Sequence, residues 1–294
     1  MMLKTKGTER SVKAMLTCYG IPSTILSIRE YGGPAPDLTK PSHYVKEKVR
    51  YALKFQGGQY VSSSWQDDTS TLRKPDTLEF RFDTKKHNVT KEDNTYTLVQ
   101  GGHNWAINVE PDTSGYENKY GKVSLHLSGS GFINTSSVLY SDSLPLYDGQ
   151  FWSVMLNRTT PSDIQLTTDN KTQDIKYTLS VKKYDNCSKK ILFKSINSLT
   201  ISGSSTDEED EALNSAVSQS NILYLGGLPS SNADYMHIPA KQFSGSLQEF
   251  RLWTEVLTQD TFNNHVAAPT AFNGNVWNSA MKKLVLRYSF NQKK

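Results

Sequence analysis

Leu78-Glu-Phe-Arg-Phe82 alternates strictly between apolar and charged side chains. Its three apolar residues fall on one face of an extended chain, and Glu79 and Arg81 fall on the other. This pattern is typical of a β-strand with one buried face. The same period of two recurs in Val49–Phe55, Lys122–Leu127, Phe151–Leu156, Tyr177–Val181, Asn221–Leu225, Leu247–Trp253 and Leu284–Phe290. Many half-buried strands without helices between them predict a mainly β protein, an antiparallel β-sandwich of the jelly-roll type, in which each sheet hides one face.

The composition of the 294 residues excludes several classes of protein. The 15 Tyr, 11 Phe and 5 Trp supply the burial that a disordered chain lacks. No apolar run approaches the roughly 20 residues that cross a bilayer, so we expect no membrane insertion. The basic first ten residues have no apolar stretch behind them, so we expect no cleaved signal peptide. Two cysteines, Cys18 and Cys187, exclude a disulfide scaffold, and we expect no bridge between them.

The positive charge is concentrated at the N-terminal end. The net charge is +4, whereas residues 1–50 alone hold nine Lys and Arg against four Asp and Glu. A nucleic-acid-binding protein would show a denser basic face interleaved with exposed aromatic residues. We therefore expect no nucleic-acid partner, and a basic segment that is solvated or docked on an acidic partner.

Residues 8–20 are predicted to form one helix that begins at an N-cap, Thr8, and ends at Gly20. One apolar stripe runs along this helix at positions i, i+3, i+4 and i+7: Val12, Met15, Leu16 and Tyr19. A short strand is predicted at Leu26–Tyr31, followed by a Gly- and Pro-rich linker over 32–41. We therefore divide the chain into an attachment segment, residues 1–44, and a β-sandwich, residues 45–294. The attachment segment is too small to fold alone, so its stripe is predicted to dock on the sandwich, on another copy or on a larger assembly.

Two segments of the sandwich are predicted to interrupt the strands. Thr258 can cap a helix in which Phe262 and Val266 share a face. The polar stretch Ile201–Ala212 is predicted to be an excursion between strands.

Three segments together resemble a concanavalin A-like sandwich of the laminin-G-like (LamG) or pentraxin-like branch. Ala52–Val61 is similar to the family's opening strand and turn. Leu146–Val154 is similar to the Asp-Gly-x-Trp-His-x-Val strand, although its Trp is displaced by one residue and Ser153 stands at the common His position. Phe243–Trp253 resembles Phe-x-Gly-x-Ile-x-Glu-Val-Arg-Ile-Trp and precedes a similar helix. The resemblance covers residues 45–294 and implies a LamG-like fold.

The remaining segment resembles proteins of tailed bacteriophages. Lys6–Pro22 is similar to the Lys-Gly-Thr helix of baseplate and tail proteins, and Arg29–Gly33 follows it in the same order. The resemblance implies a non-enzymatic structural protein of the tail, baseplate or a fibre, made in the host cytoplasm and built into the virion. Its implied partners are other virion proteins, further copies of itself and a glycan of the host surface.

Two alternative functions share this fold class. A glycan-degrading enzyme would resemble the pattern Glu-x-Asp-x-x-Glu on one strand, which places carboxylates on one cleft face. Nothing here reproduces that pattern, and the nearest acidic run, Asp207–Glu211, is predicted to be a solvated loop. We therefore predict no catalytic residue. The other alternative is a cellular adhesion or scaffold domain.

Sugar binding without catalysis needs a flat aromatic ring and a few polar groups that orient hydroxyls. Two sets of loop residues are candidates: Trp65 with Asp67 and Asp68, and Trp105 with Tyr116 and Tyr120. The alternative, which we favour, is that these aromatic rings plug the ends of the sandwich. Trp152 and Trp253 lie within alternating runs and are predicted to be core residues.

No cofactor and no metal site is predicted. Some LamG-like and pentraxin-like domains hold Ca²⁺, and four carboxylates are ligands of the right type: Asp67, Asp68, Asp112 and Asp234. No single segment has the spacing of a calcium site, so Ca²⁺ binding stays an open alternative.

Overall fold

The computed structural model describes residues 9–20, 51–64, 75–89, 95–101, 105–114, 119–127, 137–159, 171–205, 222–227, 241–276 and 280–290. The chain divides into two compact units, residues 1–48 and residues 49–294. The predicted boundary at residue 44, the linker and the predicted strand Leu26–Tyr31 lie outside the described residues.

The first unit contains the predicted helix, α1 (Glu9–Cys18). The Gly20 amide donates to the Thr17 carbonyl at 3.0 Å, and Gly20 has a φ of +82°, the left-handed conformation expected after a helix end. Most of the apolar stripe faces solvent: Tyr19 is 79% exposed, Met15 46% and Val12 40%. Leu16 is half-buried. No helix among the described residues combines the length and the apolar character that crossing a membrane requires.

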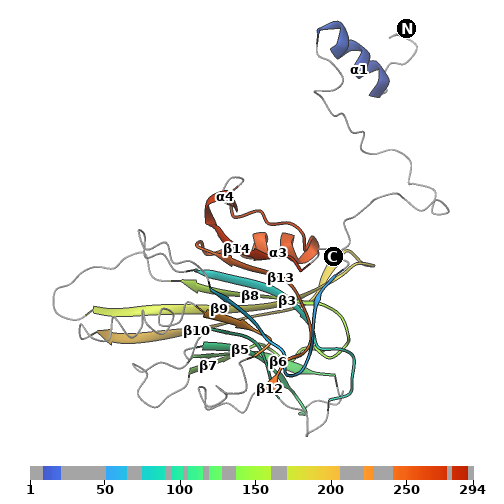
Figure 1. Ribbon diagram of the computed structural model, residues 1–294. Coiled ribbons are helices and arrows are strands. Elements are labelled where there is room, and N and C mark those ends of the chain that lie inside the picture. The colour runs from blue at the N-terminus through green and yellow to red at the C-terminus, as the bar shows by residue number, and fades with distance from the viewer. Residues whose placement is uncertain are drawn as a thin grey trace. The chain divides into compact units, whose positions relative to one another are not determined.

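The second unit is a sandwich of two seven-stranded sheets (Figure 1). Sheet A contains, in spatial order, β1 (Leu53–Gln56), β13 (Ser244–Trp253), β3 (Thr77–Asp83), β8 (Trp152–Thr159), β9 (Lys171–Asp185) and β10 (Lys190–Ser205), and β14 (Leu284–Tyr288) also pairs with β13. Sheet B contains β2 (Val61–Ser64), β11 (Ile222–Leu225), β4 (Tyr96–Gly101), β5 (Trp105–Pro111), β6 (Gly121–Leu127) and β7 (Ser137–Tyr140), and the two-residue β12 (Lys241–Gln242) pairs with β4. Apart from the parallel β12–β4 pair, neighbouring strands are antiparallel, so the predicted fold class is confirmed.

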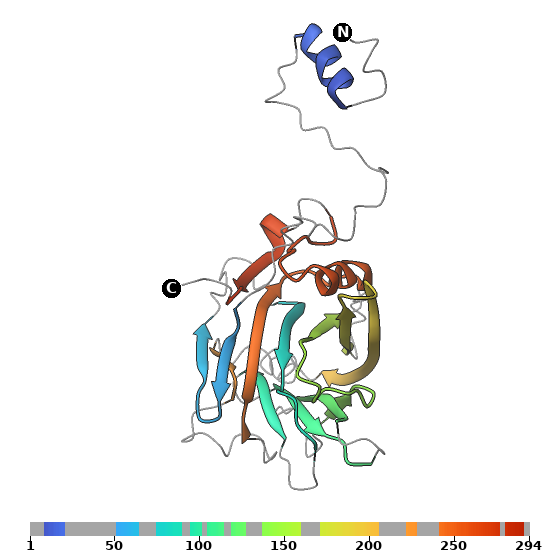
Figure 2. The same cartoon turned by 90° about the vertical axis from the view of Figure 1, so that its right-hand side faces the viewer.

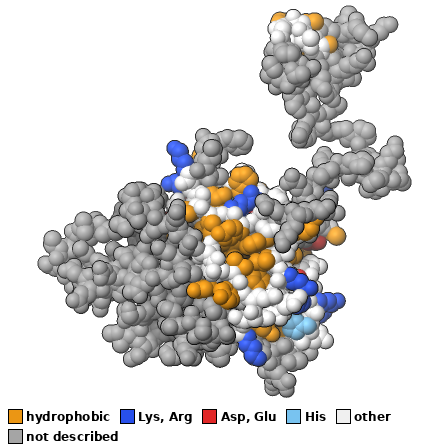
Figure 3. All heavy atoms as spheres, in the orientation of Figure 1, with side chains coloured by type: hydrophobic (Ala, Val, Ile, Leu, Met, Phe, Trp, Pro, Cys, Tyr) orange, Lys and Arg blue, Asp and Glu red, His pale blue; other side chains and the backbone are white. Residues whose placement is uncertain are grey.

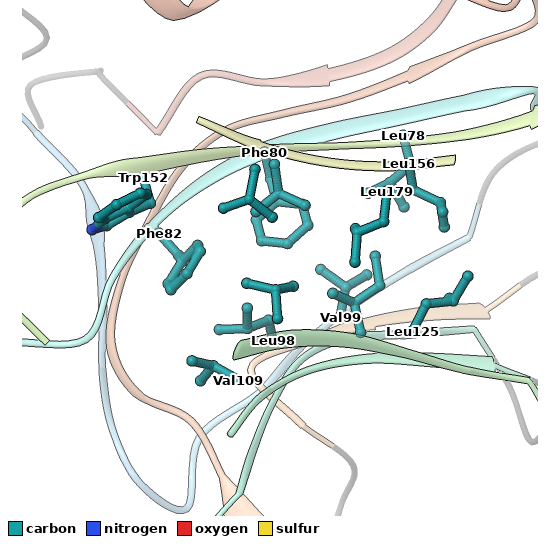
Figure 4. Close-up of a cluster of buried hydrophobic side chains, with 14 of the residues drawn as sticks. Leu78, Phe80, Phe82, Leu98, Val99, Val109, Leu125, Trp152, Leu156 and Leu179 are labelled. Carbon is teal, nitrogen blue, oxygen red and sulfur yellow. The ribbon is translucent and has the colours of Figure 1, made fainter. Parts of the chain in front are cut away.

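The main core lies between the two sheets (Figure 4). In sheet A, Phe80 lies opposite Val154, which lies opposite Val181 on the next strand. In sheet B, Ile107 lies opposite Leu125, and both side chains are fully buried. Each such side chain stabilises the fold by roughly 1.5–3 kcal/mol relative to leaving it in water. The predicted core position of Trp152 is confirmed, because its indole is fully buried in this cluster.

A third layer covers the side of sheet A that faces away from sheet B. Helix α3 (Gln259–Ala267) lies on this side (Figures 1 and 2), near α4 (Ala280–Lys283). Thr258 caps α3 as predicted, because its hydroxyl accepts from the Thr261 amide at 3.2 Å. Phe262 and Val266 are buried in a second apolar cluster with Met155, Trp253 and Leu257. Trp253 is therefore buried, as predicted, but it packs under α3 and not between the sheets.

This third layer corrects the expectation that each sheet hides only one face. Glu79 and Arg251 project from the outer face of sheet A, yet they are only 3% and 2% exposed. The residues that cover this face follow β13 in the sequence. The alternation of apolar and polar residues within a strand does not show whether another layer packs on the polar face.

The longest strands form one hairpin, β9 with β10, whose register runs from Lys190–Asp185 to Ser205–Lys171. The predicted excursion at Ile201–Ala212 is therefore wrong for its first five residues, which pair with β9. Residues 206–212 lie outside the described part. Cys187, in the turn of this hairpin, and Cys18 are both exposed free cysteines, as expected.

Candidate functional site

Polar side chains gather on the face of sheet B that points away from the core. We call this group the sheet B cluster; it consists of Asn108, Glu110, Ser124, His126 and Tyr140. The register of the sheet brings them together. Asn108 on β5 lies opposite Ser124 on β6, and Ser124 lies opposite Tyr140 on β7. Ile107 and Val109, which alternate with Asn108 and Glu110 along β5, are fully buried in the inter-sheet core, so Asn108 and Glu110 point to the opposite face.

The Glu110 carboxylate contacts two other members of the cluster, Ser124 and His126. The Ser124 hydroxyl donates to Glu110 Oε1, and His126 Nε2 lies 3.0 Å from the same oxygen. His126 Nε2 also lies 2.9 Å from Ser124 Oγ. A nucleophilic triad needs the serine on one ring nitrogen and the carboxylate on the other. Here both partners share Nε2 and the serine proton points to the carboxylate, so the arrangement orients hydrogen-bonding groups and does not activate Ser124 as a nucleophile.

The sheet B cluster contains exposed residues at its edge and a buried residue, Asn108, at its base. The Tyr140 residue is 44% exposed, and the Glu110 side chain is 24% exposed. The His126 ring lies edge-on to the Tyr140 ring, with centroids 6.3 Å apart. At the base, Asn108 is only 1% exposed, and within the described part of the chain neither Oδ1 nor Nδ2 has a hydrogen-bond partner. An unpaired buried polar group costs about 1–3 kcal/mol, so Asn108 weakens the fold where it stands.

The electrostatics of the cluster keep its carboxylate ionised. Burial alone would raise the pKa of Glu110, but hydrogen bonds from His126 and Ser124, together with the positive charge of Lys122, outweigh burial and lower that pKa. Burial, and then the charge of Glu110, raise the pKa of the Tyr140 phenol. At neutral pH the cluster therefore presents a carboxylate acceptor beside a neutral phenol.

A second carboxylate, Asp112, lies two residues beyond Glu110 at the end of β5. Hydroxyl groups of Ser114 and Ser143 hold the pKa of Asp112 well below its usual range. Its Oδ2 lies 3.4 Å from Lys122 Nζ, and its amide donates to the Tyr120 carbonyl at 2.9 Å. Tyr120 is half-buried in the chain segment that leads into β6.

The structure does not bring Trp105 and Tyr120 together. Trp105 begins β5 opposite Leu127, whereas Tyr120 precedes Gly121 at the other end of the strand pair. The two ends of this seven-residue strand are about 20 Å apart. Trp105 is not a loop residue, and the prediction of a loop there is wrong: its indole packs over Gly101 and is only 7% exposed. The other predicted sugar-binding residues lie outside the described residues: Trp65, Asp67, Asp68 and Tyr116.

Sequence reasoning missed Glu110, Ser124 and His126, although a signal was present. Trp105-Ala-Ile-Asn-Val-Glu110 alternates with period two and places Asn108 and Glu110 on one face. Among the described residues, no group of three His, Cys, Asp or Glu side chains is placed to hold a metal ion. Of the four calcium candidates, Asp67, Asp68 and Asp234 lie outside the described residues.

No family model matches the sequence, and a search of curated proteins finds no relative. The sandwich fold and the sheet B cluster are therefore the observations from which a function can be argued.

Proposed function

We propose that the chain is a non-enzymatic component of a tailed-phage virion, in its tail, baseplate or fibre, whose sandwich binds a host surface glycan at the sheet B cluster. One observation carries the binding half: the exposed Tyr140 ring stands beside a carboxylate, a hydroxyl and an imidazole that share hydrogen bonds. A phenol ring offers a flat surface for a pyranose, and Glu110 accepts hydrogen bonds from sugar hydroxyls. The phage context rests on the resemblance of Lys6–Pro22 to baseplate and tail proteins.

The charge state of the carboxylates favours binding over hydrolysis. A glycosidase needs one carboxylic acid that is protonated at working pH, held by a raised pKa, and a second ionised carboxylate. The surroundings of Glu110 and Asp112 lower both pKa values. Neither group is then a proton donor near neutral pH, which supports a non-enzymatic role over the glycan-degrading alternative.

Two features support the assembly half of the proposal. An isolated helix of ten residues is marginal in water, so α1 gains stability when its exposed stripe, Val12, Met15 and Tyr19, is covered by another virion protein or another copy. Hydrophobic side chains also gather in the middle of the described face in Figure 3, with Lys and Arg side chains around them. Such surfaces are typical of proteins that contact neighbours.

Glycan binding is testable with an array of bacterial surface polysaccharides. The full chain should bind a subset of the array, and Tyr140→Ala should reduce that binding at least tenfold, because a lost stacking contact of about 1.4 kcal/mol is a factor of ten. Tyr51→Ala is the matched control, since Tyr51 is similarly exposed, at 41%, but precedes β1 of sheet A. Equal binding by wild type and Tyr140→Ala would refute the site. Release of reducing sugar from a bound polysaccharide would favour the enzyme instead.

A further inference from the structure

A second polar group lies on the outer side of sheet A, beneath α3. We call it the α3 cluster; its charged members are Glu79, Arg81, Glu249, Arg251, His265 and Arg287. Glu249 has a φ of +49° and sits in a β-bulge between Gln248 and Arg251, where the register against β3 shifts. Bulges redirect side chains. This one lets Glu249 bond Arg251, which is two residues further along the same strand.

The carboxylates of the α3 cluster are fully engaged. Glu249 Oε2 lies 2.9 Å from Arg251 Nη2 and 3.1 Å from Arg287 Nη2. Glu79 Oε2 lies 3.5 Å from Arg251 Nη1 and accepts a hydrogen bond from Trp253 Nε1 at 3.2 Å. The two carboxylates of the cluster are therefore already paired with arginine side chains.

His265 connects α3 to Glu79. Its Nδ1 lies 3.0 Å from both oxygens of Glu79, and its Nε2 lies 2.9 Å from the Asn273 carbonyl oxygen. Both partners accept hydrogen bonds, so each ring nitrogen lies beside an acceptor. His265 apart, the α3 cluster sets three arginines, Arg81, Arg251 and Arg287, against two carboxylates. An excess of buried positive charge costs several kcal/mol unless a counter-charge accompanies it.

A small, partly open void of about 10 Å³ lies in this cluster, lined by both glutamates, by Arg81, Arg251 and His265, and by Ser153. The Nε–H groups of Arg81 and Arg251 are buried, and within the described part of the chain neither has a hydrogen-bond partner. Arg251 as a whole is only 2% exposed. A void of this volume admits one guest of about the size of a water molecule.

We propose that this void binds one small monovalent anion of the chloride type, held by the Nε–H groups of Arg81 and Arg251. Such an anion would satisfy two orphaned donors and offset part of the positive excess, and a water molecule would do only the first. The pKa of Arg81 is lowered from 12.5 to about 10, chiefly because the guanidinium is buried; Glu249 raises it in part, and the positive charge of Arg251 lowers it. Gluconate is a much larger anion than chloride and serves as the reference anion.

The test is the thermal unfolding of the full chain as sodium chloride replaces sodium gluconate at constant ionic strength. Over roughly a hundredfold range of chloride above its Kd, Tm should rise by about 5–10 °C, since ligand binding to the folded state stabilises it by mass action. Sodium bromide should act like chloride, and bromide should give an anomalous scattering peak beside both Nε atoms in crystals. Equal Tm in chloride and gluconate, with no bromide peak, would mean that the void holds water and would overturn the proposal.

Two arginine variants test whether the chloride dependence of Tm arises at this void. Arg81→Lys keeps the charge but removes the Nε–H group, so the chloride dependence of Tm should disappear. Arg158→Lys is the matched control, because Arg158 also has a buried unpartnered Nε but lies beside Asp76, away from the void. Loss of the chloride dependence in the control, or its persistence in Arg81→Lys, would contradict the assignment. If Arg81→Lys does not fold, the bromide peak in the wild-type protein decides.

Discussion

His265 Nδ1 lies 3.0 Å from both carboxylate oxygens of Glu79, although 186 residues separate the two in the sequence. The bond joins α3 to β3, the third strand of sheet A in spatial order, and the Trp253 ring stacks on the His265 ring with centroids 5.9 Å apart. Helix α3 is thus attached to the sheet by the His265–Glu79 contact as well as by the apolar contacts of Phe262 and Val266.

Replacing His265 by Ala should lower the free energy of unfolding by about 1–3 kcal/mol, because the buried Glu79 carboxylate would lose its nearest hydrogen-bond partner while it keeps Arg251 and Trp253. Chemical denaturation of the full chain measures the change. Asn264→Ala, one residue away on the exposed side of α3, should stay within about 0.5 kcal/mol of wild type. Similar losses in both variants would show that the helix, and not the His265–Glu79 contact, is the sensitive element.

Lys182 should make the protein more stable as the pH rises. Its Nζ donates to Gln259 and Asn263 of α3, and burial, then the charge of Lys194, lower its pKa from 10.5 to about 8. Between these values the unfolded chain holds more protons than the folded chain, so stability increases with pH, by up to about 3 kcal/mol over the full interval.

The measurement is the free energy of unfolding at several pH values between about 8 and 10, within the interval that the folded and unfolded pKa values of Lys182 define. Lys182→Met keeps an unbranched apolar stem and removes the titrating amine, so its stability should be nearly flat over this interval. A parallel rise in the variant would assign the pH dependence to another group.

Replacing Asn108 by an apolar residue should raise the stability of the fold and lower glycan binding. Asn108→Leu removes a buried polar group without partners and should raise the free energy of unfolding by about 1–3 kcal/mol, while it lowers glycan binding at the sheet B cluster. Asn157→Leu is the matched comparison, because the Asn157 amide is buried but bonded to Thr77 and to the Leu257 carbonyl. That variant should lose stability. Destabilisation by Asn108→Leu would mean that its carboxamide supports the fold.

The Thr258 cap should contribute about 1 kcal/mol to stability. Thr258→Ala removes the hydroxyl that accepts from the Thr261 amide and leaves that donor without this partner at the first turn of α3. Thr258→Asp should restore most of the loss, because its carboxylate can accept the same bond. Failure of the Asp variant to recover would locate the loss in the Thr258 hydroxyl's contact with Thr261 Oγ1 instead.

The sequence predicts best those strands whose polar side chains alternate cleanly with apolar ones. The pattern of β3 predicted both the strand and the face that packs in the core, since Phe80 and Phe82 are fully buried. By contrast, β10 was missed: a bulge between Ile191 and Phe193 breaks its period, and its Ser-rich end resembles a loop until β9 supplies hydrogen bonds. Long-range pairing, and not local propensity, decides such a strand.

The sheet B cluster could be predicted only in part. Asn108 and Glu110 occupy one face of β5 by period alone. The sequence does not say that Ser124 and His126 join them, because the register between β5 and β6 is set by the whole sheet. The α3 cluster was out of reach for a related reason, since Glu79 and His265 belong to elements at opposite ends of the sandwich sequence.

Strand β10 is the outermost strand of sheet A, and its sixteen residues contrast with four in each of the outermost strands of sheet B, β2 and β7. An outermost strand carries a row of backbone amides and carbonyls that its own sheet leaves unused. The bulge at Ile191/Phe193 interrupts that row at one end only. If the chain assembles as proposed, this border, to which the described residues add no further strand, offers an extended segment of a neighbour the backbone groups that would continue one sheet into the next molecule.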